Sequence, residues 1–61
     1  MLEYVKTILK KVSFDRRLFE KELVKALNVL VPKELKELKD WCYENFGHMY
    51  RVILNRHLAN I

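Results

Sequence analysis

Apolar residues recur at the spacing of an α-helix along almost the whole chain of 61 residues. The first stripe consists of Val5, Ile8, Leu9 and Val12, at positions i, i+3, i+4 and i+7. Three further stripes follow it, and short breaks separate them. The pattern predicts an all-α fold, a compact bundle of four short helices at about residues 2–12, 15–30, 32–46 and 48–59, in a single domain that spans residues 1–61.

The breaks contain residues that begin or end helices. We expect Asp15 to cap the second helix, because Phe14 and Phe19 would then form a hydrophobic staple across its first turn. We expect Pro32 to begin the third helix, where its missing N–H costs nothing. Gly47 is expected to end that helix, because glycine readily takes the left-handed conformation that often follows a helix.

The composition restricts the class of protein. Hydrophobic residues make up 51% of the chain, which is too many for a disordered protein. One glycine and one proline are too few for a turn-rich β-fold. No apolar run approaches the roughly 18 residues that span a bilayer, so we expect no membrane partner. A domain of this size has a small margin of stability, so a homodimer is a serious alternative to a monomer.

Few residues are candidates for chemistry. Cys42 lies within the apolar stripe of the third helix, which favours a buried, inert thiol over a nucleophile. A lone cysteine without an export signal favours a cytoplasmic location. His48 and His57 are the only histidines, and they do not show the paired spacings of a zinc site. We therefore expect no catalytic residues, no cofactor and no metal, and we do not expect an enzyme.

The densest aromatic stretch runs from Trp41 to Phe46. Trp41 and Tyr43 cannot both face one core on a helix, so one of them must lie at an edge or on the surface. Trp41 either closes the margin of the core or anchors a partner, and the sequence leaves both interpretations open. The expected partner surface consists of Trp41, Tyr43, Arg51 and Asn55.

Lys10, Lys11, Arg16 and Arg17 surround the first break, in a chain whose formal net charge is +4. Four cations beside a helix N-terminus are candidates for binding a phosphate or carboxylate group. An ordinary solvated surface is the favoured interpretation of these four cations. A helix-turn-helix around Gly47 is a weak match, because residues 32–47 are net acidic. Nucleic acid is therefore the less favoured partner.

Three segments resemble a set of short bacterial proteins of unknown function. These segments are Phe14-Asp15 with Leu18 to Leu23 and Lys25-Ala26, then Pro32 with Glu34-Leu35, and finally Trp41 to Gly47. The resemblance covers nearly the whole chain and implies a bacterial cytoplasmic origin and a compact helical fold. It implies no activity, cofactor or catalytic residue.

The sequence leaves the function unknown. The favoured hypothesis is a small non-enzymatic protein-interaction or structural module, whose partner is an unidentified protein or a second copy of the chain. The alternative is a weak nucleic-acid or anion-binding protein that uses the basic first break.

Overall fold

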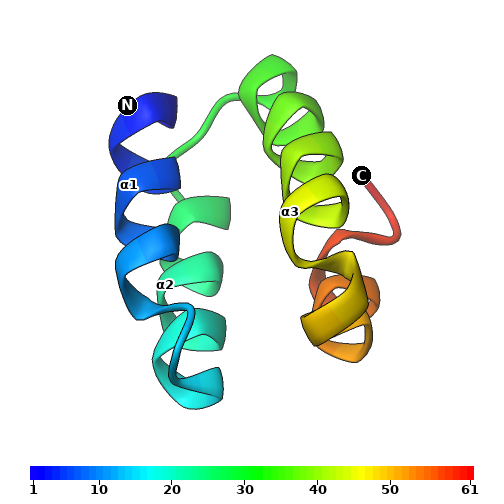
Figure 1. Cartoon of the computed structure of the whole chain (residues 1–61). Helices are drawn as coiled ribbons and strands as arrows, with labels where there is room; N and C mark the ends of the chain where they lie inside the picture. Colours follow the sequence, from blue (N-terminus) through cyan, green and yellow to red (C-terminus); the bar gives the residue numbers. More distant parts are fainter.

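The computed structural model covers residues 1–61 and contains three helices, α1 (Leu2–Val12), α2 (Arg16–Leu27) and α3 (Pro32–Leu58). Helices α1 and α2 run antiparallel to each other, and α3 lies against this pair (Figure 1). The all-α class is confirmed, whereas the predicted number of four helices is wrong. No helix is long and apolar enough to cross a lipid bilayer.

The corner between α1 and α2 has the predicted cap. The Asp15 Oδ1 atom accepts hydrogen bonds from the backbone N–H groups of Arg17, at 2.9 Å, and Leu18, at 3.2 Å. These are two of the donors that a helix N-terminus otherwise leaves without a partner. Helix α2 ends at Leu27, earlier than predicted, because the chain tightens there into a turn whose N–H groups bond three residues back.

The predicted hydrophobic staple at this corner does not form. The Phe14 side chain is 80% exposed, whereas Phe19 is fully buried. The Phe19 ring turns toward α3, where it stacks on Tyr50 with ring centroids 4.6 Å apart and meets the edge of Phe46 at 5.0 Å. Phe19 thus packs against two rings of α3 and not against Phe14. The Phe14 side chain projects into solvent at the corner.

Gly47 does not end a helix, so the predicted boundary between helices 32–46 and 48–59 is wrong. Helix α3 continues through Gly47, which is buried and has no positive φ. The backbone leaves helical geometry three residues later, at Tyr50, with φ −126° and ψ 34°. The Tyr50 ring stacks on Phe19 and its hydroxyl donates a hydrogen bond to the Ser13 carbonyl. Helix α3 therefore bends at Tyr50, where this residue contacts α2 and the corner before it, and not at Gly47.

A single apolar core lies between the three helices. Its fully buried members include Leu9 of α1, Leu23 of α2, and Leu38, Cys42 and Leu54 of α3. The accessible surface of the chain is 4236 Å², which agrees with the roughly 4,200 Å² expected for a folded monomer of this mass. The chain is therefore compact without a second copy.

Candidate functional site

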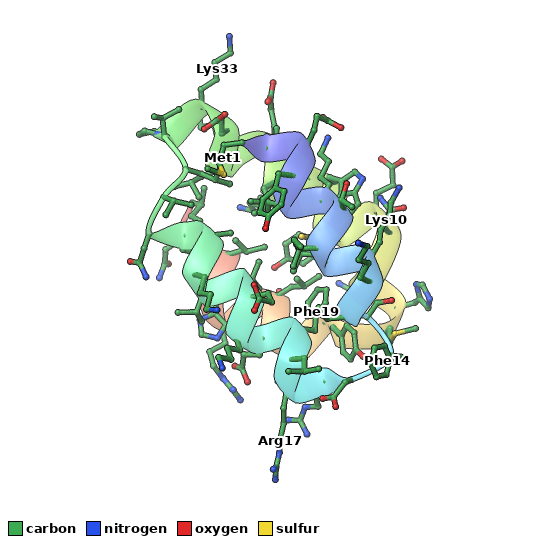
Figure 2. The ribbon with its side chains drawn as sticks, turned by 90° about the vertical axis from the view of Figure 1, so that its left-hand side faces the viewer. Met1, Lys10, Phe14, Arg17, Phe19 and Lys33 are labelled. Carbon is green, nitrogen blue, oxygen red and sulfur yellow. The ribbon has the colours of Figure 1, made fainter.

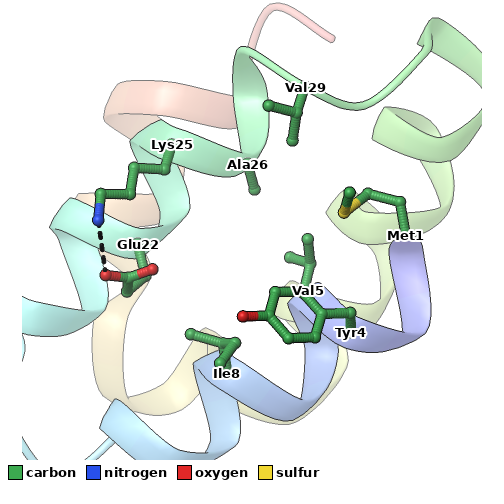
Figure 3. A pocket seen from close by; sticks show the side chains of 8 residues that line it. All are labelled: Met1, Tyr4, Val5, Ile8, Glu22, Lys25, Ala26 and Val29. Atoms are coloured by element: carbon green, nitrogen blue, oxygen red, sulfur yellow. Dashed lines mark hydrogen bonds and ion pairs between the residues drawn. The ribbon is translucent and has the colours of Figure 1, made fainter.

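An open apolar groove lies between α1 and α2. It has a volume of about 300 Å³, and six of its eight lining residues are hydrophobic. In Figure 3 the side chains of α1 and α2 face each other across it, and the ribbon of α3 lies behind them. We call this feature the α1–α2 groove, and it is lined by Met1, Tyr4, Val5, Ile8, Glu22, Lys25, Ala26 and Val29.

The groove is apolar because several hydrophobic residues on and beside α1 and α2 stay outside the core. Val5 and Leu9 of α1 are buried against the other helices. Tyr4 is 65% exposed, and Val29, just after α2, is 59% exposed. Single exposed apolar residues are normal, but a contiguous set with a concave shape is typical of a binding surface.

Charge at the edge of the groove is balanced. The Lys25 Nζ atom lies 3.4 Å from the Glu22 Oε2 atom, and Figure 3 draws this contact as a dashed line. An exposed pair of this kind contributes little to stability. The two side chains also cancel each other's charge, so the groove presents mainly an apolar, concave surface.

Trp41 is half-buried at the margin of the core. Its ring meets the edge of Phe46 at 5.4 Å, and the Nζ atoms of Lys6 and Lys10 lie 5.7 Å and 5.9 Å from the ring centroid. Two ammonium groups over an aromatic face are attracted by its quadrupole. These contacts tie the first half of α3 to α1.

The four residues of the expected partner surface are not all brought together. Trp41 faces α1, whereas the Tyr43 hydroxyl donates a hydrogen bond to the Asn55 Oδ1 atom in the last turns of α3. Arg51 lines a separate shallow hollow with Met49. Tyr43 and Asn55 thus form a pair across the bend, and the other two residues lie elsewhere.

The basic residues at the first corner do not converge on a free helix terminus. Asp15 already accepts from the first N–H groups of α2, so an added anion would compete with an internal carboxylate. In Figure 2 the side chains of Lys10 and Arg17 project in different directions. Lys11 and Arg16 are also exposed. The four cations therefore form a charged surface around the corner without a defined anion cradle.

An ionic cluster joins α2 to the end of α3. The Glu20 Oε2 atom lies 2.8 Å from His57 Nε2 and 2.9 Å from Arg56 Nη1. The hydrogen bond with His57, supported by Arg56, holds the pKa of the Glu20 carboxyl below its ordinary value. The cluster fixes the last turns of α3 against α2.

The lone thiol lies away from this cluster, within the core. Burial raises the pKa of Cys42 to about 12, so the thiol stays protonated and poorly nucleophilic at neutral pH. No group of three His, Cys, Asp or Glu side chains is arranged to hold a metal ion. The position of Cys42 agrees with the core residue that its place in the apolar stripe predicts.

No protein-family model, curated protein or solved structure matches the chain. The resemblance to short bacterial proteins therefore stays a prediction. The sequence interpretation missed the α1–α2 groove, although a signal for it was present. Met1, Tyr4 and Val29 are apolar residues that fall outside the main helical stripes, and such residues are the ones left exposed here.

Proposed function

We propose that the chain is a small non-enzymatic interaction module that binds the apolar side chains of a partner protein in the α1–α2 groove. The observation that carries this proposal is the concave, largely apolar lining of the groove. Its exposed members include Met1, at 68%, and Tyr4. A partner helix laid along the groove would cover them with its own apolar face.

The size of the groove favours side chains over a small-molecule ligand. Its volume of about 300 Å³ lies at the bottom of the range of roughly 300–1,000 Å³ that small-molecule sites occupy. The only polar side chains in its lining, apart from the Tyr4 hydroxyl, are Glu22 and Lys25, which pair with each other. The groove thus offers few groups to orient a polar substrate.

We place this module in the cytoplasm. The support is the free, buried thiol of Cys42, which has no disulfide partner. Reducing compartments keep such thiols free. A second copy of the chain is another possible occupant of the groove, and the test below separates it from a different protein by the mass of the adduct.

Site-specific photo-crosslinking tests the proposal. Benzoylphenylalanine replaces Tyr4, which is exposed and aromatic, and in a control chain it replaces Lys36 on the exposed surface of α3. Each substituted chain is expressed in the cells that produce the natural protein, the cells are irradiated, and the adducts are resolved by mass. We expect a discrete protein adduct from position 4 and none of the same mass from position 36.

Two matched valine variants show whether the groove itself makes the contact. Val29 in the groove and Val52 on α3 are 59% and 67% exposed, so glutamate at either position leaves the core intact. Val29→Glu should abolish the adduct formed from position 4, and Val52→Glu should leave it unchanged. The absence of an adduct, or an adduct that is indifferent to Val29→Glu, would refute the proposal.

A further inference from the structure

The corner between α1 and α2 forms a second apolar surface, separate from the groove. Phe14, at 80% exposure, is the most exposed large hydrophobic residue of the chain. It projects from the corner between Lys10 and Arg17 in the view of Figure 2. Met49 and Val52, both largely exposed, lie on α3 in a shallow hollow that Arg16 also lines.

The corner and the bend of α3 are held together. The Tyr50 hydroxyl donates to the carbonyl of Ser13, the residue before Phe14. The exposed apolar residues on the two segments therefore belong to one end of the molecule. We call this end the corner patch, and it comprises Phe14, Met49 and Val52 with the cations Lys10, Lys11, Arg16, Arg17 and Arg51.

The corner patch carries the whole net charge of the protein. Its five cations and one carboxylate, Asp15, sum to +4, which equals the formal charge of the chain, so the remaining residues are neutral in total. None of the five cations takes part in an ion pair, in contrast to Lys6, Lys25 and Arg56. The Asp15 carboxylate is already engaged as the cap of α2. Apart from Lys10, whose ammonium lies over the Trp41 ring, these cations have no side-chain partner and are available to an anionic one.

We propose that the corner patch docks on an anionic lipid bilayer, with Phe14 inserted among the headgroups and the cations facing lipid phosphates and carboxylates. Interfacial binding combines buried apolar area with attraction to anionic lipids. The phosphates of a nucleic-acid duplex would engage the cations but leave Phe14 without an apolar partner, and only a single strand could stack a base on its ring. This surface contact departs from the expectation of no membrane partner, which was based on the absence of a spanning run.

The proposal goes beyond the interaction function and is independent of it. Met1 and Tyr4, at the start of α1, line the groove, whereas the corner patch lies at the last turn of α1, the corner that follows it and the bend of α3. Both surfaces can be occupied at the same time. The protein would then hold its partner at the membrane surface.

Vesicle flotation with the full chain tests the proposal. The protein is mixed with vesicles of phosphatidylcholine alone or with about 30% phosphatidylserine, the lipid that makes the cytoplasmic leaflet negative. We expect flotation only with the anionic vesicles, and its loss at about 0.5 M salt, where surface charges are screened. A chain that remains unbound to the anionic vesicles at about 50 mM salt overturns the proposal.

Variants separate the apolar contribution from that of charge. Phe14→Ser should lower the vesicle partition coefficient about tenfold, because it removes an inserted aromatic ring. Arg16→Gln with Arg17→Gln should lower it about thirtyfold. Val29→Ser, which changes an exposed groove residue, should have no effect, and circular dichroism checks that each variant is folded.

The same chains are then tested for binding to polyuridylic acid under the same salt conditions. If the wild-type chain binds this RNA more tightly than it binds anionic vesicles, the corner patch is a nucleic-acid surface and the membrane proposal is wrong; a loss of RNA affinity in Phe14→Ser would then mean that a base stacks on the ring. If RNA binding is the weaker of the two and Phe14→Ser affects only the vesicles, the membrane proposal is supported. Neither result bears on the groove, which the crosslinking at position 4 tests separately.

Discussion

Replacing Gly47 with alanine should stabilise the protein, because α3 continues through this position. Glycine in a helix interior costs about 1 kcal/mol relative to alanine. A Cβ atom at this position would have only the Arg51 Nη2 atom near it, at 3.9 Å, which is an ordinary contact with a flexible side chain. We therefore expect the free energy of unfolding to rise by about 1 kcal/mol. In a domain of this size that corresponds to about 4–8 °C in Tm.

The opposite sign would follow if Gly47 ended a helix in the left-handed conformation. Alanine there would be strained, at a cost of roughly 1–2 kcal/mol. Urea unfolding followed by circular dichroism at the helical band distinguishes the two cases. Lys36→Ala, at an exposed position of the same helix, is the control, and it should change the free energy of unfolding by less than about 0.5 kcal/mol. A destabilised Gly47→Ala variant would refute a helix that continues through position 47.

Three further changes test the contacts that hold the helices together. Tyr50→Phe removes the hydrogen bond to the Ser13 carbonyl and should lower the free energy of unfolding by about 1 kcal/mol in urea; an unchanged value would show that the hydroxyl does not fix the bend. Because the pKa of Glu20 is lowered in the folded state, its ionised carboxylate stabilises the fold at pH values above the ordinary carboxyl pKa of 4.5. This stabilisation is lost as the pH falls through the pKa of the folded state. Melting of Glu20→Gln should accordingly depend less on acid pH than melting of the wild type, and equal dependence would contradict this. The Cys42 thiol keeps its proton in the fold to about pH 12, against 9.0 for an ordinary thiol, so stability should fall by about 1.4 kcal/mol per pH unit across that interval. Cys42→Ala should remove this part of the slope in unfolding measured at alkaline pH, and identical slopes for the two chains would refute it.

The local signals along the chain predicted much of the fold. The stripe of α1, the cap at Asp15 and the start of α3 at Pro32 depend on neighbouring residues, and the structure has all three. The helix that continues through Gly47 could not be predicted this way. The backbone leaves helical geometry only at Tyr50, whose ring and hydroxyl contact Phe19 and Ser13, and both of these residues lie about thirty or more positions earlier in the chain.

The candidate surfaces were harder to predict than the helices. Phe14 was assigned to a staple with Phe19, but Phe19 has better partners in α3, so Phe14 is exposed. Trp41 lies at the core margin, where two lysines of α1 lie over its ring. Which apolar residue stays exposed depends on which rings pack together in the core. The periodicity of residues along one helix does not contain that information.

The most direct test of the account is a titration of the partner segment recovered from the Tyr4 adduct into isotope-labelled protein, followed by NMR. We predict that the largest amide shift changes fall on Tyr4, Ile8 and Val29, around the α1–α2 groove. Shift changes concentrated on Tyr43 and Asn55, with the groove residues unmoved, would contradict this prediction and place the binding surface on α3.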